Sequence, residues 1–223
     1  MTTPRPPADL ATRTPRRITL PEGTRLHRFH PAGLGALYFD RSREGRFNAP
    51  DGSYGVLYVA RERAGAFAET FLRSPGARLI DPGLMRRKAY VCFEVLRPLT
   101  LIEFTGPGLA VVGATAEVSH RGLPYDVPQA WSKALRDHPV KADGLAYTAR
   151  HDETAQCHAL FDQASGALGV CAAEATLDVD WFWQLAEDYG LACPPPQPSA
   201  RPRGPRGRNV RKSHRLRQPH GLR

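Results

Sequence analysis

An arginine, a tyrosine and a glutamate are spaced along the segment from Gly45 to Glu69, GRFNAPDGSYGVLYVARERAGAFAE. Arg46 lies in a loop-forming stretch rich in Asn, Pro, Asp and Gly, Tyr58 lies in the apolar run 56–59, and Glu69 lies in a helical pattern. A guanidinium can bind phosphate through two parallel hydrogen bonds, and a tyrosine ring can stack on a planar ring. The segment therefore predicts a site for a phosphorylated ligand that carries a ring.

A second arginine precedes this segment. Arg28 lies in the sequence LHRFHP, close to the apolar residues Leu26 and Phe29 of an expected strand. An arginine held at the edge of a core needs an anion, which a bound phosphate would supply, as would a carboxylate such as Glu69. From the residues alone, both partners stay open.

Glu69 and Tyr58 each have an ordinary structural interpretation beside the functional one. On a helical wheel, the apolar residues of 64–72 form one stripe and Glu69 lies outside it, where solvated carboxylates are common. Tyr58 fits the core aromatic of a strand equally well. Gly65, one turn before Glu69, would leave open space beside the carboxylate, which favours the functional interpretation.

Short periodic segments predict the elements that would position these side chains. Runs rich in β-branched and aromatic residues predict strands at 26–29, 36–39, 56–60, 89–95, 99–104, 144–147 and 158–161. Apolar residues at helical spacing predict helices at 64–72, at 127–137 and from Asp178 or Asp180 to Gly190. Since strands and helices follow one another without regular alternation, the expected fold class is α+β.

Length and composition indicate a single domain with tails. The chain has 223 residues, of which 41% are hydrophobic, enough to bury the core of one domain. Residues 1–23 are rich in Pro and Arg without an apolar period and are expected to form a flexible lead-in. The domain would then span 24–193, followed by a disordered Pro- and Arg-rich basic tail over 194–223.

The net charge of +9 is concentrated in that tail. Nine of the 31 Lys and Arg lie in residues 201–223, which contain no acid, so the other 22 balance the 22 Asp and Glu. Such a tail could bind RNA, DNA or an acidic partner through salt-sensitive contacts, or could be a solvated extension without a ligand. One alternative function is therefore a nucleic-acid-binding or ribosome-associated protein that acts through its tail.

Membrane and metal-binding classes are disfavoured. The sequence has no apolar run long enough to cross a bilayer, and its first twenty residues lack the apolar stretch of a signal peptide, so we expect a cytoplasmic protein. The four cysteines lack CxxC spacing, which argues against zinc and gives no reason to expect disulfides; they are Cys92, Cys157, Cys171 and Cys193. We expect no metal.

Several short motifs, taken in order, resemble the RES domain family. They are Arg28, Gly45-Arg46-Phe47-Asn48, Val56-Leu57-Tyr58, Ala68-Glu69, the run GLAYTARHD from Gly144 to Asp152, and Ala159-Leu160-Phe161. The likeness runs from about residue 26 to residue 171 and leaves out both tails. It implies an ADP-ribosyltransferase-like fold, with a mixed β-sheet core and flanking helices. It also implies an NAD-consuming toxin of a bacterial toxin–antitoxin pair.

The resemblance implies a role for each candidate residue. Breaking the nicotinamide–ribose bond passes through an oxocarbenium-like state, which the carboxylate of Glu69 would stabilise. Arg28 and Arg46 would hold the pyrophosphate, and Tyr58 would pack on the nicotinamide end. Glu69, Arg46 and Tyr58 are thus the expected catalytic residues.

One position departs from the family pattern. RES proteins carry a serine where the alignment places Ala149, and Thr148 beside it is the expected source of the missing hydroxyl. Without it, one hydrogen bond to NAD is lost, worth on the order of 1 kcal/mol. The activity would then be reduced.

The leading hypothesis is an NAD-degrading toxin that acts by hydrolysis or phosphorolysis, with NAD as its substrate. A protein ADP-ribosyltransferase on the same fold is the alternative. The implied partner is a cognate antitoxin encoded by an adjacent gene. The acceptor of the ADP-ribose and the oligomeric state, including a homo-oligomer, stay open.

Overall fold

The computed structural model of the chain describes residues 4–74 and 76–192. The predicted basic tail over 194–223 lies outside these residues, so its expected disorder stays a prediction. No helix within the described ranges is long and apolar enough to cross a membrane.

An eight-stranded mixed sheet forms the centre of the domain, in the order β1-β5-β6-β7-β3-β2-β4-β8. Only the pair β5 and β6 is parallel, and the other neighbours run antiparallel. The strands are β1 (Arg17–Leu20), β2 (Arg25–Pro31), β3 (Val56–Ala60), β4 (Lys88–Val95), β5 (Leu99–Glu103), β6 (Gly144–Ala149), β7 (Asp152–Phe161) and β8 (Leu168–Glu174).

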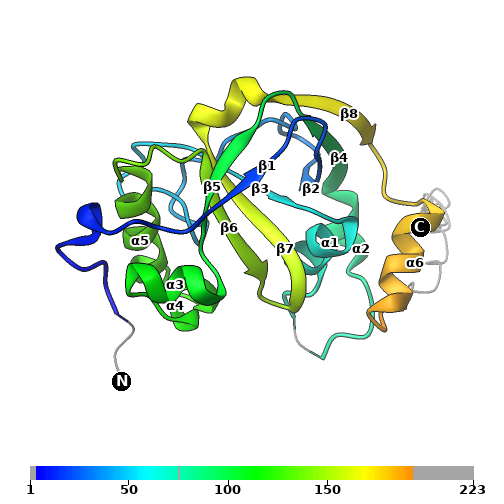
Figure 1. Cartoon of the computed structure of the whole chain (residues 1–223). Coiled ribbons are helices and arrows are strands. Elements are labelled where there is room, and N and C mark those ends of the chain that lie inside the picture. Colours follow the sequence, from blue (N-terminus) through cyan, green and yellow to red (C-terminus); the bar gives the residue numbers. More distant parts are fainter. Residues whose placement is uncertain (1–3, 75, 193–223) are drawn as a thin grey trace, which may run out of the picture.

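Helices flank the sheet in two groups (Figure 1). One group gathers on the side of β5 and β6 and contains α3 (Gly106–Val112), α4 (Ala116–His120) and α5 (Asp126–Arg136). The other lies on the side of β2 and β4 and contains α1 (Arg63–Phe71), α2 (Pro82–Arg86) and α6 (Asp180–Asp188). Two 3-10 turns complete the described chain, η1 (Leu10–Thr12) and η2 (Asp162–Ala167). The predicted α+β class, with a mixed sheet and flanking helices, is confirmed.

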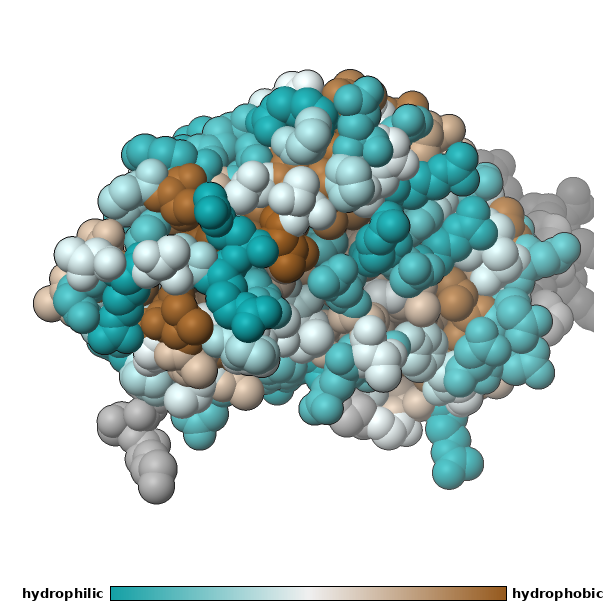
Figure 2. Space-filling view, in the orientation of Figure 1, coloured by the Kyte–Doolittle hydropathy of each residue, from teal (hydrophilic) through white to brown (hydrophobic). Residues whose placement is uncertain are grey.

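Alternation along the strands builds a core on each face of the sheet. In β3, Val56 and Ala60 belong to the larger core, which the helices cover, whereas Leu57 and Val59 belong to the second core. Tyr58 points to the same side as Val56, because side chains two residues apart share a face. Hydrophobic residues that reach the surface form small separate patches among hydrophilic ones on the face shown in Figure 2.

The apolar run 36–39 does not form the predicted strand. After Pro31 the chain makes two turns, at Gly33 and near Gly35, and returns to the sheet only through the bridge from Asp40 to Val56. Ala36 and Phe39 pack against the second core instead. The apolar pattern therefore reflects burial of a loop, because packing produces the same signal as strand pairing at this length.

The N-terminal lead-in was predicted to be flexible, and this is wrong for the part that the structure describes. Arg17–Leu20 forms β1, which pairs with β5, and Leu10 is buried in the larger core. The indole nitrogen of Trp131 donates to the carbonyl of Pro4 at 2.8 Å. Strand pairing, one buried leucine and one hydrogen bond therefore anchor a segment whose average composition is typical of a flexible chain.

Two further differences concern the second half of the chain. The polar segment between the strands predicted at 144–147 and 158–161 belongs mostly to β7, which begins at Asp152. Residues 154–157 of β7 alternate between exposed and buried positions, as in a strand with one face on the core. The sequence pattern also did not predict β8 or the three helices α2, α3 and α4, all of which are short or only weakly periodic.

The separation of β2 from β3 opens the sheet at the position of the candidate site. The two strands pair only at His27 and Ala60. Residues 28–31 of β2 continue to pair with β4, while β3 continues along β7. The sheet thus splits at this point, and side chains of both strands face the opening.

Candidate active site

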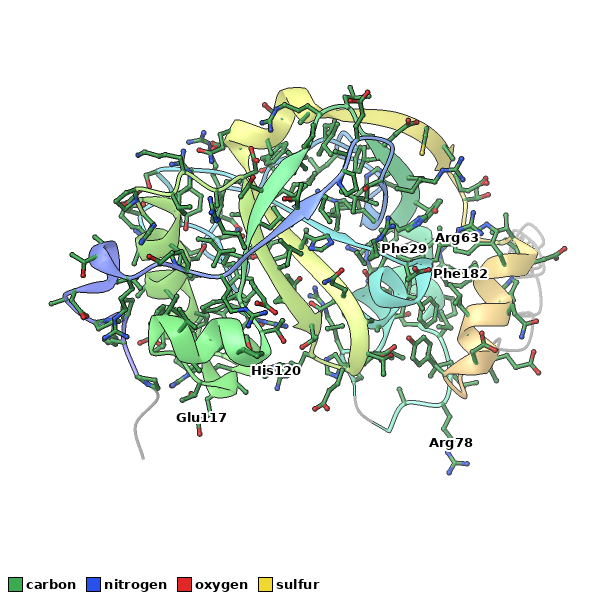
Figure 3. All side chains as sticks on the ribbon, viewed as in Figure 1. Phe29, Arg63, Arg78, Glu117, His120 and Phe182 are labelled. Atoms are coloured by element: carbon green, nitrogen blue, oxygen red, sulfur yellow. The ribbon has the colours of Figure 1, made fainter. Side chains whose placement is uncertain are left out.

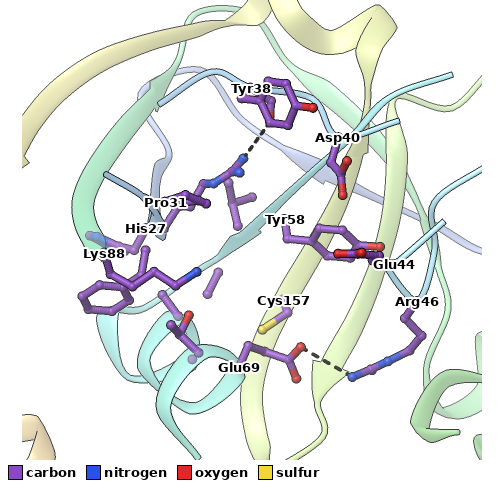
Figure 4. Close-up of a pocket in the computed structure, with 18 of the residues that line it drawn as sticks. His27, Pro31, Tyr38, Asp40, Glu44, Arg46, Tyr58, Glu69, Lys88 and Cys157 are labelled. Atoms are coloured by element: carbon purple, nitrogen blue, oxygen red, sulfur yellow. Dashed lines mark hydrogen bonds and ion pairs between the residues drawn. The ribbon is translucent and has the colours of Figure 1, made fainter. Parts of the chain in front are cut away.

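A cavity of about 480 Å³ occupies the split between β2 and β3 (Figure 4). Four of the five predicted site residues line it, each from a different part of the chain. Arg28 comes from β2, Arg46 from the loop before β3, Tyr58 from β3 and Glu69 from α1. The structure therefore brings together residues that are up to 41 positions apart in the sequence. Thr148 does not line this cavity.

Arg46 is enclosed by aromatic rings and by a carboxylate. Its side chain is only 10% exposed, and its guanidinium lies 5.7 Å from the ring centre of Phe47 and 5.6 Å from that of Tyr147. Nη1 donates to the carbonyl of Ser119 at 2.8 Å, and Nη2 lies 3.5 Å from Oε2 of Glu69. Burial alone would lower the pKa of Arg46, but Tyr147 and Glu69 outweigh it and raise the pKa overall. The guanidinium is therefore a fixed positive charge.

Glu69 is an oriented carboxylate. Oε1 accepts a hydrogen bond from the backbone N–H of Arg150 at 2.7 Å, and Oε2 faces Arg46. The side chain is 22% exposed and borders the cavity, so the interpretation as an ordinary solvated carboxylate does not describe its surroundings. A carboxylate held by a backbone donor and a cation has a defined direction, as an electrostatic role requires.

Gly65 lines the cavity together with Glu69 and has a second role that the sequence did not suggest. A Cβ at this position would lie 3.1 Å from the methyl carbons of Ala60 and Ala155, tighter than most such contacts. Gly65 therefore also lets α1 pack closely onto β3 and β7. The close approach still serves the site, because it sets the height of α1 above the sheet.

Tyr58 connects the sheet to the loop that carries Arg46. Its hydroxyl accepts from the backbone N–H of Phe47 at 2.7 Å and donates to Oδ1 of Asn48 at 2.9 Å. Burial raises the pKa of Tyr58 well above its usual value, so the hydroxyl stays protonated and can donate. Gly45 fits against this pair, since a Cβ there would lie 2.1 Å from Oδ1 of Asn48.

Further polar contacts fix the same loop, and sequence reasoning missed them. The amide nitrogen of Asn48 donates to Oδ2 of Asp40 and to the carbonyl of Ser42, both at 2.9 Å. Gln129 of α5 donates to the carbonyls of Arg43 and Gly45, also at 2.9 Å. A fully buried Asn in a polar loop was the available signal, because buried amides are normally hydrogen-bonded.

The other end of the cavity is basic. Arg28, Arg73 and Lys88 line it, and within the described residues none of the three takes part in a salt bridge. Arg28 donates to the carbonyl of Tyr38 at 3.3 Å and does not pair with Glu69. Burial lowers its pKa to about 10, which leaves it charged at neutral pH. Burial also lowers the pKa of Lys88, and repulsion from Arg73 and Arg28 lowers it further. A bound anion would offset the repulsion among these cations.

Thr148 lies behind the cavity wall. Its hydroxyl is 3.2 Å from Nε2 of His120 in α4, and the adjacent residue, Ala149, is fully buried. Ser119, next to His120, supplies the carbonyl that holds Arg46. Thr148 is thus linked to the site through α4, and the geometry offers no direct contact with the cavity.

The fold and the cavity together define an α+β domain with a partly enclosed ligand site that four Arg and Lys side chains and three carboxylates line, the oriented Glu69 among them. Within residues 4–74 and 76–192, no cluster of three or more His, Cys, Asp or Glu side chains has the arrangement of a metal site. The RES domain matches residues 39–182 of the chain, and the protein belongs to the RES domain family.

Two known proteins are similar to this chain. A protein of Sinorhizobium fredii (strain NBRC 101917 / NGR234), named probable toxin y4kH, is 27% identical over 124 residues, which are 55% of this chain and 96% of that protein. The fold is similar to that of a chain in the crystal structure of the M. tuberculosis MbcT–MbcA toxin–antitoxin complex, with a TM-score of 0.56. That likeness covers 75% of this chain and 91% of the other at 15% identity, and it shows a shared fold.

Proposed function

We propose that this RES-domain protein is the toxin of a toxin–antitoxin pair and that it cleaves the nicotinamide–ribose bond of NAD. The observation that carries the proposal is the pairing of Glu69 with Arg46 at one end of a cavity whose other end is basic. NAD has the matching distribution of charge, because its reacting ribose becomes cationic in the transition state and its pyrophosphate is anionic.

Glu69 acts on the reacting ribose. As the bond from the ribose C1′ to the nicotinamide nitrogen breaks, positive charge develops on the ribose ring, and a carboxylate beside it stabilises that charge. The backbone N–H of Arg150 and the guanidinium of Arg46 hold the carboxylate in one direction. Nicotinamide leaves, and water or phosphate then bonds to C1′.

The phosphates of NAD bind at the basic end. Arg28 and Lys88 lie on neighbouring strands, and Arg73 follows α1, so the three cations approach the opening between β2 and β3 from two sides. Arg46 supplies a further cation nearer to Glu69. Lys88 and Arg73 thus join the two arginines that the sequence singled out.

Tyr58 and Thr148 position other groups. The hydroxyl of Tyr58 is engaged by Phe47 and Asn48, so the residue holds the Arg46 loop while its ring borders the cavity. Thr148 holds His120 and, through α4, the carbonyl that binds Arg46. The Ala149 position then needs no hydroxyl of its own for Arg46 to be held.

The relatives support the biological role. The Sinorhizobium protein is named a probable toxin, and the M. tuberculosis structure is a toxin–antitoxin complex. We propose an antitoxin partner for this chain on that basis, encoded by an adjacent gene. Induced expression should arrest growth, and coexpression of the neighbouring gene should relieve the arrest.

Release of free nicotinamide tests the enzymatic proposal. Purified full-length protein is incubated with NAD, with and without inorganic phosphate, and nicotinamide is separated and quantified. Wild type should release it, and Glu69→Gln should lower the rate by roughly 10²- to 10³-fold, the usual effect of removing an electrostatic stabiliser. Glu153→Gln is the matched control, because Glu153 is exposed on β7 outside the cavity.

The acceptor is identified in the same reactions. ADP-ribose indicates attack by water, ADP-ribose 1″-phosphate indicates attack by phosphate, and a mass increase on a protein in a lysate indicates ADP-ribosyl transfer. Absence of nicotinamide release under all three conditions contradicts the proposed function.

A further inference from the structure

Two cysteines from adjacent strands are in direct contact on the far side of β2 from the split. Cys92 lies in β4 and Cys171 in β8, the edge strand of the sheet. Their sulfur atoms are 2.8 Å apart, and both side chains are free thiols. A disulfide bond is about 2.05 Å long, so the sulfurs need to move by less than 1 Å to bond.

A bulge in β8 creates this contact. Cys92 is opposite Ala172 and Phe93 is opposite Val170, which leaves Cys171 as an extra residue between the two pairs. A β-bulge redirects the side chain of its extra residue. Here the redirected thiol also lies 3.2 Å from the carbonyl oxygen of Cys92.

The two thiols differ in exposure. Cys171 is exposed at the sheet edge, whereas Cys92 is buried with 4% of its surface accessible. Burial and the neighbouring Cys171 raise the pKa of Cys92 to about 12, so Cys92 stays a protonated thiol at neutral pH. Cys171 is therefore the thiol that a reagent in solution meets first.

We propose that Cys92 and Cys171 form a redox-active pair that closes to an intramolecular disulfide when the protein meets a peroxide. The thiolate of Cys171 attacks hydrogen peroxide, which gives a sulfenic acid on Cys171 and releases hydroxide. The sulfur of Cys92 then attacks that sulfur, the S–S bond forms, and the sulfenic oxygen leaves as water with the proton of Cys92. Two thiols are oxidised by two electrons and one peroxide is reduced.

The bond would fasten the C-terminal part of the domain to the sheet. β8 is an edge strand held on one side by β4, and it leads into α6. Phe182 of α6 packs on Phe29 of β2 and on Phe67 of α1, at ring-centre distances of 6.0 and 5.4 Å. Figure 3 shows Phe182 and Phe29 close together. Because α1 carries Glu69, the disulfide would secure a layer that supports the site without touching the cavity.

Mass spectrometry tests the cross-link directly. The full chain in a Cys193→Ser background is treated with stoichiometric hydrogen peroxide, its free thiols are alkylated, and it is digested without reduction. This background removes the one cysteine outside the described residues. The expected result is a loss of 2 Da in the intact mass and one linked peptide pair that contains Cys92 and Cys171, with Cys157 alkylated after unfolding.

Single variants provide the controls. Cys92→Ala and Cys171→Ala should each abolish the 2 Da loss, and Cys157→Ala should leave it unchanged. The oxidised protein should melt roughly 5 to 15 °C higher than the reduced one, because the bond closes a loop between residues that are 79 positions apart. If unvaried Cys92 and Cys171 are both alkylated after treatment, or if Cys171 alone is oxidised to a sulfinic acid, the proposal is wrong. This outcome is independent of nicotinamide release.

Discussion

Replacing Tyr58 with Phe should loosen the loop that carries Arg46 while keeping an aromatic ring at the cavity. The change removes a hydrogen bond to Asn48 and leaves the backbone N–H of Phe47, a fully buried residue, without its acceptor. A lost neutral hydrogen bond costs about 1 kcal/mol and an unpaired buried donor about 1 to 3 kcal/mol. The free energy of unfolding should therefore fall by about 2 to 4 kcal/mol.

Urea unfolding measures this loss, and a double-mutant cycle with Asn48→Ala assigns it to the contact. The two single variants and the double variant should give a coupling energy of about 1 kcal/mol between Tyr58 and Asn48. Tyr38→Phe is the control, because Tyr38 is 43% exposed and its hydroxyl makes no hydrogen bond within residues 4–74 and 76–192. It should unfold at the urea concentration of wild type.

Nicotinamide release separates a loop role from a direct ligand role. If Tyr58 mainly positions Arg46, the Phe variant should raise the KM for NAD and lower kcat, and Asn48→Ala should do the same. An unchanged unfolding midpoint in Tyr58→Phe, or full activity in Asn48→Ala, would contradict this role of Tyr58.

Three further perturbations concern single residues. Gly45→Ala should destabilise the fold and abolish activity, because its Cβ would lie 2.1 Å from Oδ1 of Asn48; Gly33→Ala, with open space around it, should be neutral in the same unfolding and activity assays. Burial lowers the pKa of His158 to about 4, so only the unfolded chain gains a proton as pH falls from about 6.5 to 4. His158 alone should leave stability level above pH 6.5 and lower it by up to roughly 3 kcal/mol towards pH 4. Because the pKa of His27 is also lowered to about 4, His27 adds to this fall, so His158→Leu should reduce the fall in urea titrations without abolishing it. Lys88→Met should raise the KM for NAD about tenfold, as expected for the loss of one partly buried charge contact, and Lys88→Arg should restore most of the affinity.

The sequence predicted the local elements around the site well where one periodic signal dominated. The apolar run of β3 and the stripe of α1 identified both elements, and the position of Tyr58 and Glu69 followed from them. The local sequence patterns did not predict the contacts between distant segments. Nothing in the local pattern indicates that β2 and β3 separate after His27, yet this separation creates the cavity.

Individual residues show the same limit. Gly65 lines the cavity near Glu69, but its close packing on β3 and β7 was not predicted. Thr148 was expected to contact the ligand, but its hydroxyl lies beside His120. This histidine belongs to α4, a helix that the sequence did not predict. Lys88 and Arg73 are ordinary charged residues in their own segments of the sequence. Only the structure shows that both line the cavity.

The proposed function depends most on the carboxylate of Glu69, which we propose promotes cleavage of NAD. The most direct measurement compares nicotinamide release by wild type and Glu69→Gln at saturating NAD, after both proteins are shown to unfold at similar urea concentrations. Electrostatic stabilisation by Glu69 predicts a fall in kcat of roughly 10²- to 10³-fold with a much smaller change in KM. Equal kcat values for the two proteins would contradict it.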